Sequence, residues 1–403
     1  MQIRRRTIFY VQGYDPRGIA EYYRMFRREF RCTCELYGLT GKISGAQHDP
    51  KRFITSWDVS THGDGWQVET RYQFLRWEDI IRQDFARPAW WKIAHMYAAT
   101  VRALLNGVIV RMLRAHWRFG LFTLYTPLLM TLWLALGVAI GILASKLVAA
   151  LGAPLPVPTM VGLVAAIGSF GSLLWLTESR TYLLYLCDDV VATDRFAHCK
   201  RPDWDERLET FAGYVADAMA RSDADEIIVI GHSSGSFLAV DVLDRALARD
   251  PALGRHGPRV RLLTLGANLP IVGFHPAAQW FRDRMRRLAH APDIDWVDYQ
   301  SRHDVMNFWP FDPITGHGIE PAPGRTNPTV VAISFRDLWK GGHFGRRRWR
   351  FFSAHFQFLL ANERLGSAYD YYLICCGPFD LMTRATAPDR VTAAAPEAGT
   401  SNK

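Results

Sequence analysis

The chain has 403 residues, of which 49% are apolar, 13% aromatic and 22% charged. This composition excludes a largely disordered chain, because 23 Phe, 15 Tyr and 14 Trp require burial in at least one large core. The 48 Lys and Arg against 39 Asp and Glu give a net charge of +9, which suits an anionic membrane surface, an anionic substrate or a nucleic acid. The six cysteines show no Cys-x-x-Cys spacing, so we expect reduced thiols and neither a metal site nor a cofactor.

Residues 1–85 show alternating strand and helix signals. The apolar run 7–11 predicts a short buried strand that ends in Gln12-Gly13-Tyr14. Residues 17–31 predict a helix, and the alternating residues 70–77 predict a second strand. We expect this segment to be the first part of an α/β domain.

Residues 86–178 contain two long apolar runs. Residues 119–145 carry no charge and would form a helix about 40 Å long, which exceeds the ~30 Å of a bilayer core. After a proline-rich link, residues 157–177 form a second run of spanning length that contains the small residues Gly162, Gly168 and Gly171. We therefore expect a transmembrane helical hairpin, with two buried helices of a soluble core as the alternative.

The charges that flank these runs predict the orientation of the hairpin. Arg111, Arg114 and Arg118 precede the first run and Arg180 follows the second, whereas Lys146 is the only cation near the link. The positive-inside bias then places the protein in the cytoplasmic (inner) membrane with two spans and both termini cytoplasmic.

Residues 96–118 predict a basic amphipathic helix. Its apolar side lies opposite the arginines, so we expect the helix to lie along the membrane surface, with a solvated basic helix as the alternative. The apolar side consists of Leu104, Leu105, Val108, Ile109 and Met112.

Residues 179–384 continue the α/β pattern, and residues 385–403, rich in Ala, Thr and Pro, predict a disordered tail. Strands that alternate with helices indicate a mostly parallel, doubly wound sheet, interrupted by the inserted hairpin. The predicted helices are 204–221 and 236–249, and the predicted strands are 226–230, 260–265, 296–300 and 329–335.

The sequence Gly231-His232-Ser233-Ser234-Gly235 lies between a predicted apolar strand and a predicted helix. A Gly-x-Ser-x-Gly turn in this context presents the serine hydroxyl at the carboxyl edge of the sheet, where a nucleophile can act. Ser233 is therefore the candidate nucleophile, and a turn that only packs is the alternative.

A serine nucleophile needs a base and an orienting acid, which in this fold follow it in the order acid, then histidine. Asp304 comes just after a predicted strand and is the candidate acid, whereas Asp298 lies inside that strand. His355 is the preferred base because an apolar helical segment follows it, and His343, in a glycine loop, is the alternative. His317 precedes the last strand and is disfavoured.

The motifs at residues 12–14, 231–235, 304–305 and 355–359 resemble those of the α/β-hydrolase superfamily, in its lipase-like, membrane-anchored bacterial branch. The resemblance implies an α/β-hydrolase fold whose first strand pair is shortened or missing. It also implies that the backbone N–H groups of Tyr14 and Ser234 form the oxyanion hole, with Gln12 in the place of the usual histidine.

Two functions follow as hypotheses. The first is a membrane-anchored serine hydrolase that cleaves an ester or thioester, with a lipid-like acyl substrate suggested by the aromatic residues Phe308, Trp309, Phe311, Trp339 and Phe344. The second is a non-catalytic membrane scaffold or partner-binding protein, whose Arg346, Arg347, Arg348 and Arg350 contact lipid head groups or an acidic partner. The basic residues accompany no nucleic-acid-binding motif, so we expect the lipid bilayer and the substrate as partners and no nucleic acid. The sequence predicts no particular oligomeric state.

Overall fold

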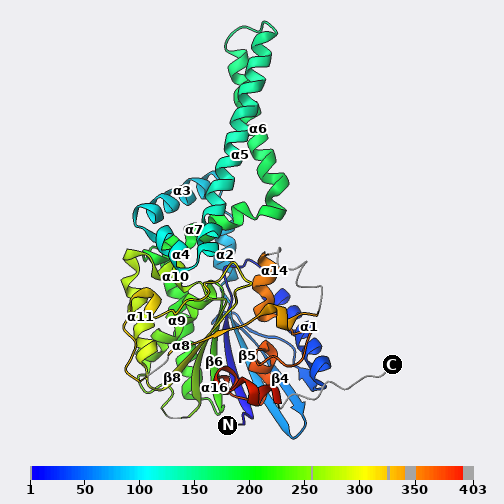
Figure 1. Ribbon diagram of the computed structural model, residues 1–403, viewed down its shortest axis with the longest axis vertical. Helices are drawn as coiled ribbons and strands as arrows, with labels where there is room; N and C mark the ends of the chain where they lie inside the picture. Colours follow the sequence, from blue (N-terminus) through cyan, green and yellow to red (C-terminus); the bar gives the residue numbers. More distant parts are fainter. Residues whose placement is uncertain (1, 256, 325–326, 341–350, 394–403) are drawn as a thin grey trace, which may run out of the picture.

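The computed structural model describes residues 2–255, 257–324, 327–340 and 351–393. Within these residues, nine strands form one mixed, mostly parallel sheet in the order β2-β4-β5-β1-β6-β7-β8-β9, with β3 paired to β4 (Figure 1). The predicted α/β fold class is confirmed. The strands are β1 (Arg5–Val11), β2 (Thr40–Ile43), β3 (Gln47–Asp49), β4 (Ile54–Gly63), β5 (Trp66–Leu75), β6 (Glu226–His232), β7 (Arg259–Leu265), β8 (Ile294–Gln300) and β9 (Thr329–Ala332).

The parallel part of the sheet is built from segments on both sides of the apolar insertion. Strand β1 pairs in parallel with both β5 and β6, and β6, β7, β8 and β9 continue the parallel order. Strands β2, β3 and β4 are antiparallel and form one edge. None of these three strands was predicted from the sequence. Strands β2 and β3 are short and largely exposed and thus carry little apolar pattern. In the described chain β1 is the first strand, and the antiparallel strands follow it.

Side chains that alternate along the central strands divide between two cores. Phe9 and Val11 of β1 face one core, and Ile8 and Tyr10 face the other, because successive side chains of a strand point to opposite faces. One face is covered by α8 (Pro202–Ala220), α9 (Gly235–Arg249) and α11 (Gln279–His290). The opposite face is covered by α1 (Ile19–Tyr37), α15 (Tyr371–Cys376) and α16 (Leu381–Thr386). The sheet is therefore buried on both sides, as its apolar strands predict.

Two long helices, α5 (Trp117–Ala150) and α6 (Val157–Thr181), form a hairpin that projects away from the sheet (Figure 1). Both are long and apolar enough to cross a membrane. They pack closely where glycines face each other, since a Cβ on Gly141 would lie 2.5 Å from the carbonyl oxygen of Gly162. Of the three glycines noted in the second run, only Gly162 makes such a contact, because a Cβ on Gly168 or Gly171 would meet nothing within 4 Å.

A layer of shorter helices lies between the hairpin and the sheet (Figure 1). It contains α2 (Glu78–Phe85), α3 (Ala89–Leu105), α4 (Val108–Ala115) and α7 (Leu183–Ala197), together with α10 (Leu269–Gly273) from the sheet domain. The single amphipathic helix expected over residues 96–118 is instead two helices, α3 and α4, which are bent by 74° at the break between them. Helix α7 was not predicted from the sequence.

Short helices complete the C-terminal part of the described chain. They are α12 (Phe335–Leu338), α14 (Phe351–His355) and α17 (Pro388–Ala393). The expectation of disorder from residue 385 onward is wrong for residues 385–393, which end α16 and form α17. The buried side chain of Val391 holds α17 against the protein.

Candidate active site

Ser233 lies in the turn between β6 and α9 and has a positive φ of 57°. This left-handed conformation is unfavourable for a residue with a Cβ, and the turn that contains it needs neighbours without side chains. A Cβ on Gly235 would lie 2.2 Å from the carbonyl oxygen of Val11, and one on Gly231 would lie 2.4 Å from that of Gly235. The Ser233 N–H donates to the carbonyl oxygen of Leu265 at 3.0 Å. The turn therefore has the tight geometry that the Gly-x-Ser-x-Gly motif requires.

Asp304 and His355 form a buried pair although they are 51 residues apart. Asp304 lies in the loop after β8, and His355 ends α14. Nδ1 of His355 lies 2.6 Å from Oδ2 of Asp304, whose Oδ1 accepts the N–H of Met306 at 2.9 Å. An ionised carboxylate can only accept, so Nδ1 donates and Nε2 keeps its lone pair. Nε2 is buried with no hydrogen-bond partner among the described residues, so its lone pair is free to accept a proton.

The alternative candidates for acid and base, Asp298 and His317, form hydrogen bonds with other residues and not with Asp304 or His355. Asp298, inside β8, accepts hydrogen bonds from Thr264 Oγ1 at 2.5 Å and Gln300 Nε2 at 2.7 Å, and burial raises its pKa to about 6. His317 donates through Nδ1 to the carbonyl oxygen of Pro313 at 2.6 Å. His343 lies outside the described residues, as do Phe344, Arg346, Arg347, Arg348 and Arg350.

The histidine ring and the serine turn rest on the same strand end. A Cβ on Gly266 would lie 3.1 Å from Cε1 of His355. Gly266 directly follows Leu265, the residue that binds the Ser233 N–H. The ring centroid of His232 lies 4.7 Å from that of His355, and its Nε2 donates to the His355 carbonyl oxygen at 3.1 Å. The end of β7 and His232 at the end of β6 thus support the imidazole beside the turn that contains Ser233.

The loop after β1 approaches the serine closely. A Cβ on Gly13 would lie 3.0 Å from the Cβ of Ser233 and 3.4 Å from its Oγ, so only glycine permits this approach without movement. The following residue, Tyr14, is held by a hydrogen bond from its hydroxyl to Asp84 Oδ2 at 2.8 Å. Tyr14, Ser233 and Ser234 all line one cavity. This brings together the two residues whose backbone N–H groups the family resemblance assigns to the oxyanion hole.

Gln12 has a structural role in this loop. Its side chain is fully buried and donates through Nε2 to the carbonyl oxygen of Asp15 at 3.1 Å. Its own carbonyl oxygen accepts the indole N–H of Trp77 at 3.1 Å. These two bonds fix the loop on both sides of Gly13.

Asn268 is a site residue that the sequence analysis missed. It lies just after β7, and its Nδ2 donates to Ser233 Oγ at 3.3 Å. Its backbone N–H donates to Ser236 Oγ at 3.1 Å, and that hydroxyl donates to the Ser233 carbonyl oxygen at 2.6 Å. A polar side chain directly beyond a predicted parallel strand was the signal that could have identified it, because such positions meet at the carboxyl edge of the sheet.

The cavity beside Ser233 is small, with a volume of about 100 Å³. Its floor is the carboxyl edge of the sheet, and its roof is the inserted layer of helices together with the first turns of α5. The roof is mainly apolar, and its residues include Ala103, Val108, Ile109, Met112, Phe119 and Phe122. A serine at the edge of the sheet thus faces an apolar chamber whose roof continues into the long apolar hairpin.

The apolar side of α4 faces this chamber. Val108, Ile109 and Met112 are each at most 3% exposed and line the cavity, whereas the sequence analysis placed them against the membrane surface. Leu104 and Leu105, from the same predicted stripe, are 50% and 82% exposed. The bend between α3 and α4 separates the two groups, so of this predicted stripe only Leu104 and Leu105 remain exposed.

Asp189 is a second site residue that the sequence analysis missed. It projects from α7 into the cavity lining, and its enclosed Oδ1 has no hydrogen-bond partner among the described residues. Burial raises its pKa to about 7, with a further contribution from the neighbouring Asp188 carboxylate. Asp188 itself forms an ion pair with Lys92 of α3 at 2.6 Å. Two adjacent carboxylates directly after an apolar run were the available signal.

The N-terminal end of α5 is tied to the loop that carries Asp304. His116 donates through Nδ1 to the carbonyl oxygen of Asn307 at 2.8 Å, and the Asn307 side chain donates to the carbonyl oxygen of Asp304 at 2.7 Å. The ring of Phe119 lies 4.2 Å from that of Phe308 between centroids. The position of the acid therefore depends on where the hairpin begins.

Phe311 and Trp339, which were also expected near the site, pack against other aromatic residues. Phe311 packs against Phe308, with ring centroids 5.7 Å apart. Trp339 is buried in the core on the opposite face of the sheet, against Phe335.

The chain was compared with models of protein families, with curated proteins and with solved structures, and none of the three comparisons finds a match.

Proposed function

We propose that the protein is a membrane-anchored serine hydrolase of the α/β-hydrolase type that cleaves an ester or thioester. The observation that carries this proposal is the arrangement at the carboxyl edge of the sheet. Ser233 occupies a left-handed turn, and a buried histidine with a free Nε2 is held by Asp304 beside the same strand end. A nucleophile, a base and an orienting acid in the chain order Ser, Asp, His are the parts that acyl transfer requires.

In the proposed reaction, Ser233 Oγ attacks the acyl carbonyl carbon while Nε2 of His355 takes the hydroxyl proton. Asp304 keeps the imidazole in the productive tautomer and stabilises the imidazolium. The backbone N–H groups of Tyr14 and Ser234 hold the developing oxyanion, and the latter lies at the N-terminus of α9, where the helix dipole favours negative charge. The imidazolium then gives its proton to the leaving alcohol or thiol. In the second half of the reaction His355 takes a proton from a water molecule that attacks the acyl carbonyl carbon, and the imidazolium returns this proton to Ser233 Oγ as the bond between Oγ and the acyl group breaks.

The cavity supports an acyl group as the part of the substrate that is bound. The part of its roof formed by α4 and the first turns of α5 is mainly apolar and continuous with the hairpin, so an acyl chain could lie against it. A chain drawn from a bilayer would enter beside the helices that themselves contact lipid. This favours a lipid-like ester or thioester over a small polar ester.

We infer that both termini and the sheet domain lie on the cytoplasmic side of the inner membrane. Arg111, Arg114 and Arg118 before α5 and Arg180 near the end of α6 support this orientation. A reporter fused after Ala153, in the link between the two helices, is expected to behave as exported. Fusions at either terminus are expected to behave as cytoplasmic, and an exported C-terminus would reverse the orientation.

The experiment that tests the hydrolase activity is labelling of the full-length protein in membranes by a fluorophosphonate probe. Wild-type protein is expected to react, and Ser233→Ala is expected to lose labelling together with hydrolysis of p-nitrophenyl esters by about 10³-fold or more. The matched control is Ser222→Ala, a serine before β6 at the opposite edge of the sheet, which should label as wild type does. Equal labelling of Ser233→Ala, or none in the wild type, would favour the non-catalytic scaffold.

A further inference from the structure

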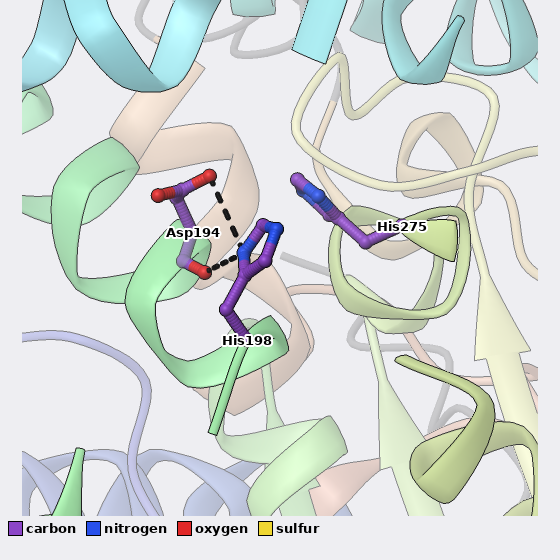
Figure 2. Close-up of side chains that lie close together, drawn as sticks. All are labelled: Asp194, His198 and His275. Carbon is purple, nitrogen blue, oxygen red and sulfur yellow. Dashed lines mark hydrogen bonds and ion pairs between the residues drawn. The ribbon is translucent and has the colours of Figure 1, made fainter. Parts of the chain in front are cut away.

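Three metal-ligating side chains converge beside the candidate active site. Asp194 lies near the end of α7, His198 follows one turn later, and His275 lies just after α10. One ligand atom from each of them lies within 4.8 Å of the other two. Figure 2 shows the two imidazole rings and the carboxylate turned toward one another.

We propose that Asp194, His198 and His275 bind a divalent transition-metal ion of the Zn²⁺ type. Two imidazoles and one carboxylate are a ligand set that this class of ion prefers. In a tetrahedral zinc site the ligand atoms lie about 3.4 Å apart, given bond lengths of about 2.1 Å, so small side-chain rotations would close the triangle around the ion.

The hydrogen bonds around the cluster leave lone pairs on His198 and on the Asp194 carboxylate that a metal ion can use. His198 donates through Nδ1 to the backbone carbonyl oxygen of Asp194 at 2.7 Å, so its Nε2 keeps a lone pair. This is the outer bond that commonly orients a metal-binding histidine. Arg102 of α3 donates to Oδ2 of Asp194 at 2.5 Å and through Nε to Oδ1 at 3.4 Å, which orients the carboxylate. Oδ1 faces His198, whose Nδ1 is 3.6 Å away.

His275 provides the independent indication of a ligand. It is 5% exposed, and its buried Nδ1 has no hydrogen-bond partner among the described residues. A buried ring nitrogen without a partner is costly, and a bound ion would remove that cost. In Figure 2 its ring points toward Asp194 and His198.

The location suggests what the ion would do. Asp194 and His198 belong to the inserted segment that roofs the cavity, whereas His275 belongs to the sheet domain. The ion would therefore fasten the roof to the domain beneath it. Asp194 and His275 also line the cavity that contains Ser233, so the fourth coordination position would open toward that cavity. A water molecule or an anionic group of a bound substrate could occupy this position.

The test is zinc binding by the full-length protein, purified in detergent and stripped of metal with a chelator. Bound zinc is measured by mass spectrometry after gel filtration, and affinity by competition with a chromophoric chelator. We expect one Zn²⁺ per chain and a rise in Tm on the order of 5 °C, with no rise for Mg²⁺, which prefers oxygen ligands.

The variants separate this site from adventitious binding and from the hydrolase chemistry. His198→Gln and His275→Gln are expected to weaken zinc binding by about 100-fold or more and to abolish the Tm rise. His62→Gln, an exposed histidine at the far end of β4, should bind zinc as the wild type does. Ser233→Ala should do so as well, whether or not the protein is a hydrolase. Because His275 is buried, circular dichroism is used to check that the His275→Gln protein is folded. The half-buried His198 provides a second variant that is less prone to misfold. Zinc binding that is absent from the wild type, or unchanged in a folded His198→Gln protein, would overturn the proposal.

Discussion

Asn268 donates its side-chain amide to the hydroxyl oxygen of Ser233 across 3.3 Å. The amide comes from the residue three positions beyond β7. The backbone N–H of Asn268 donates to Ser236 Oγ, so its orientation is held by the first turn of α9, the helix that follows Ser233. A donor aimed at this oxygen stabilises negative charge on it. Asn268 is therefore expected to assist the proposed reaction, although it belongs to neither the triad nor the oxyanion hole.

Replacing Asn268 by alanine should lower kcat/KM for ester hydrolysis by roughly 3- to 10-fold, the value of one neutral hydrogen bond. Asn268→Asp should lower it further, because a carboxylate would oppose the charge that develops on the serine oxygen. Asn106→Ala, at the exposed turn between α3 and α4, is the matched control. Steady-state kinetics provide the measurement, and a rate for Asn268→Asp equal to that of the wild type would contradict the assigned role.

His355→Gln should abolish probe labelling and lower ester hydrolysis by about 10³-fold or more, because it removes the base that Asp304 holds. His343→Gln should retain activity. Both variants are compared by labelling at equal protein amount, after circular dichroism has shown that they are folded. Activity that survives in the first variant and disappears in the second would make His343 the base, while leaving Ser233 and Asp304 in place.

Shortening the hairpin should release the protein from the membrane without opening the cavity. Trp133 of α5 and Thr177 of α6 face each other, with Nε1 and Oγ1 3.2 Å apart, so a short Gly-Ser link can replace residues 134–176. The cavity residues of α5, which end at Thr126, remain. The remaining apolar stub, residues 119–133, is about 22 Å long, too short to span a bilayer core.

Carbonate washing of membranes measures the outcome. The shortened protein is expected in the soluble fraction with probe labelling retained. The same link in place of residues 152–156 keeps both helices and should leave the protein in the membrane. A shortened protein that stays in the membrane fraction would show that other surfaces, such as the exposed leucines of α3, suffice for anchoring.

Asp189→Asn should stabilise the protein more at pH 8 than at pH 5. The pKa of Asp189 is raised to about 7 in the folded protein by burial and by the charge of Asp188, whereas an unfolded aspartate has a pKa of about 3.9. The unfolded chain therefore loses this proton first, and the stability of the wild type falls as the pH rises from about 4 to about 7. Asparagine carries no proton to lose, so the variant avoids this decrease.

Thermal unfolding at both pH values provides the measurement. Asp217→Asn, on the exposed face of α8, is the control, and its effect on Tm should be similar at pH 5 and pH 8. A Tm difference between Asp189→Asn and the wild type that does not grow with pH would contradict the elevated pKa.

Much of the fold could be predicted from the sequence because it depends on residues close together in the chain. A stretch of 24 residues contains strand β6, the glycines around Ser233 and helix α9. The residues of this stretch favour few conformations other than a strand, a tight turn and a helix. The two apolar helices are equally local, since a charge-free run of spanning length identifies them. Asp304 could also be proposed, because polar residues that follow parallel strands meet at one edge of the sheet, and His355 could be proposed because an apolar helical segment follows it.

The tertiary structure alone decided which apolar surfaces meet protein and which remain exposed. Val108 and Leu105 have the same chemistry and lie three residues apart, yet one is buried over the cavity and the other is 82% exposed. Burial against protein and burial in lipid both remove apolar area from water, so composition cannot distinguish them. The bend between α3 and α4 makes the difference. The cluster of Asp194, His198 and His275 likewise depends on packing, because α7 and the turn after α10 become neighbours only when the insertion closes over the sheet.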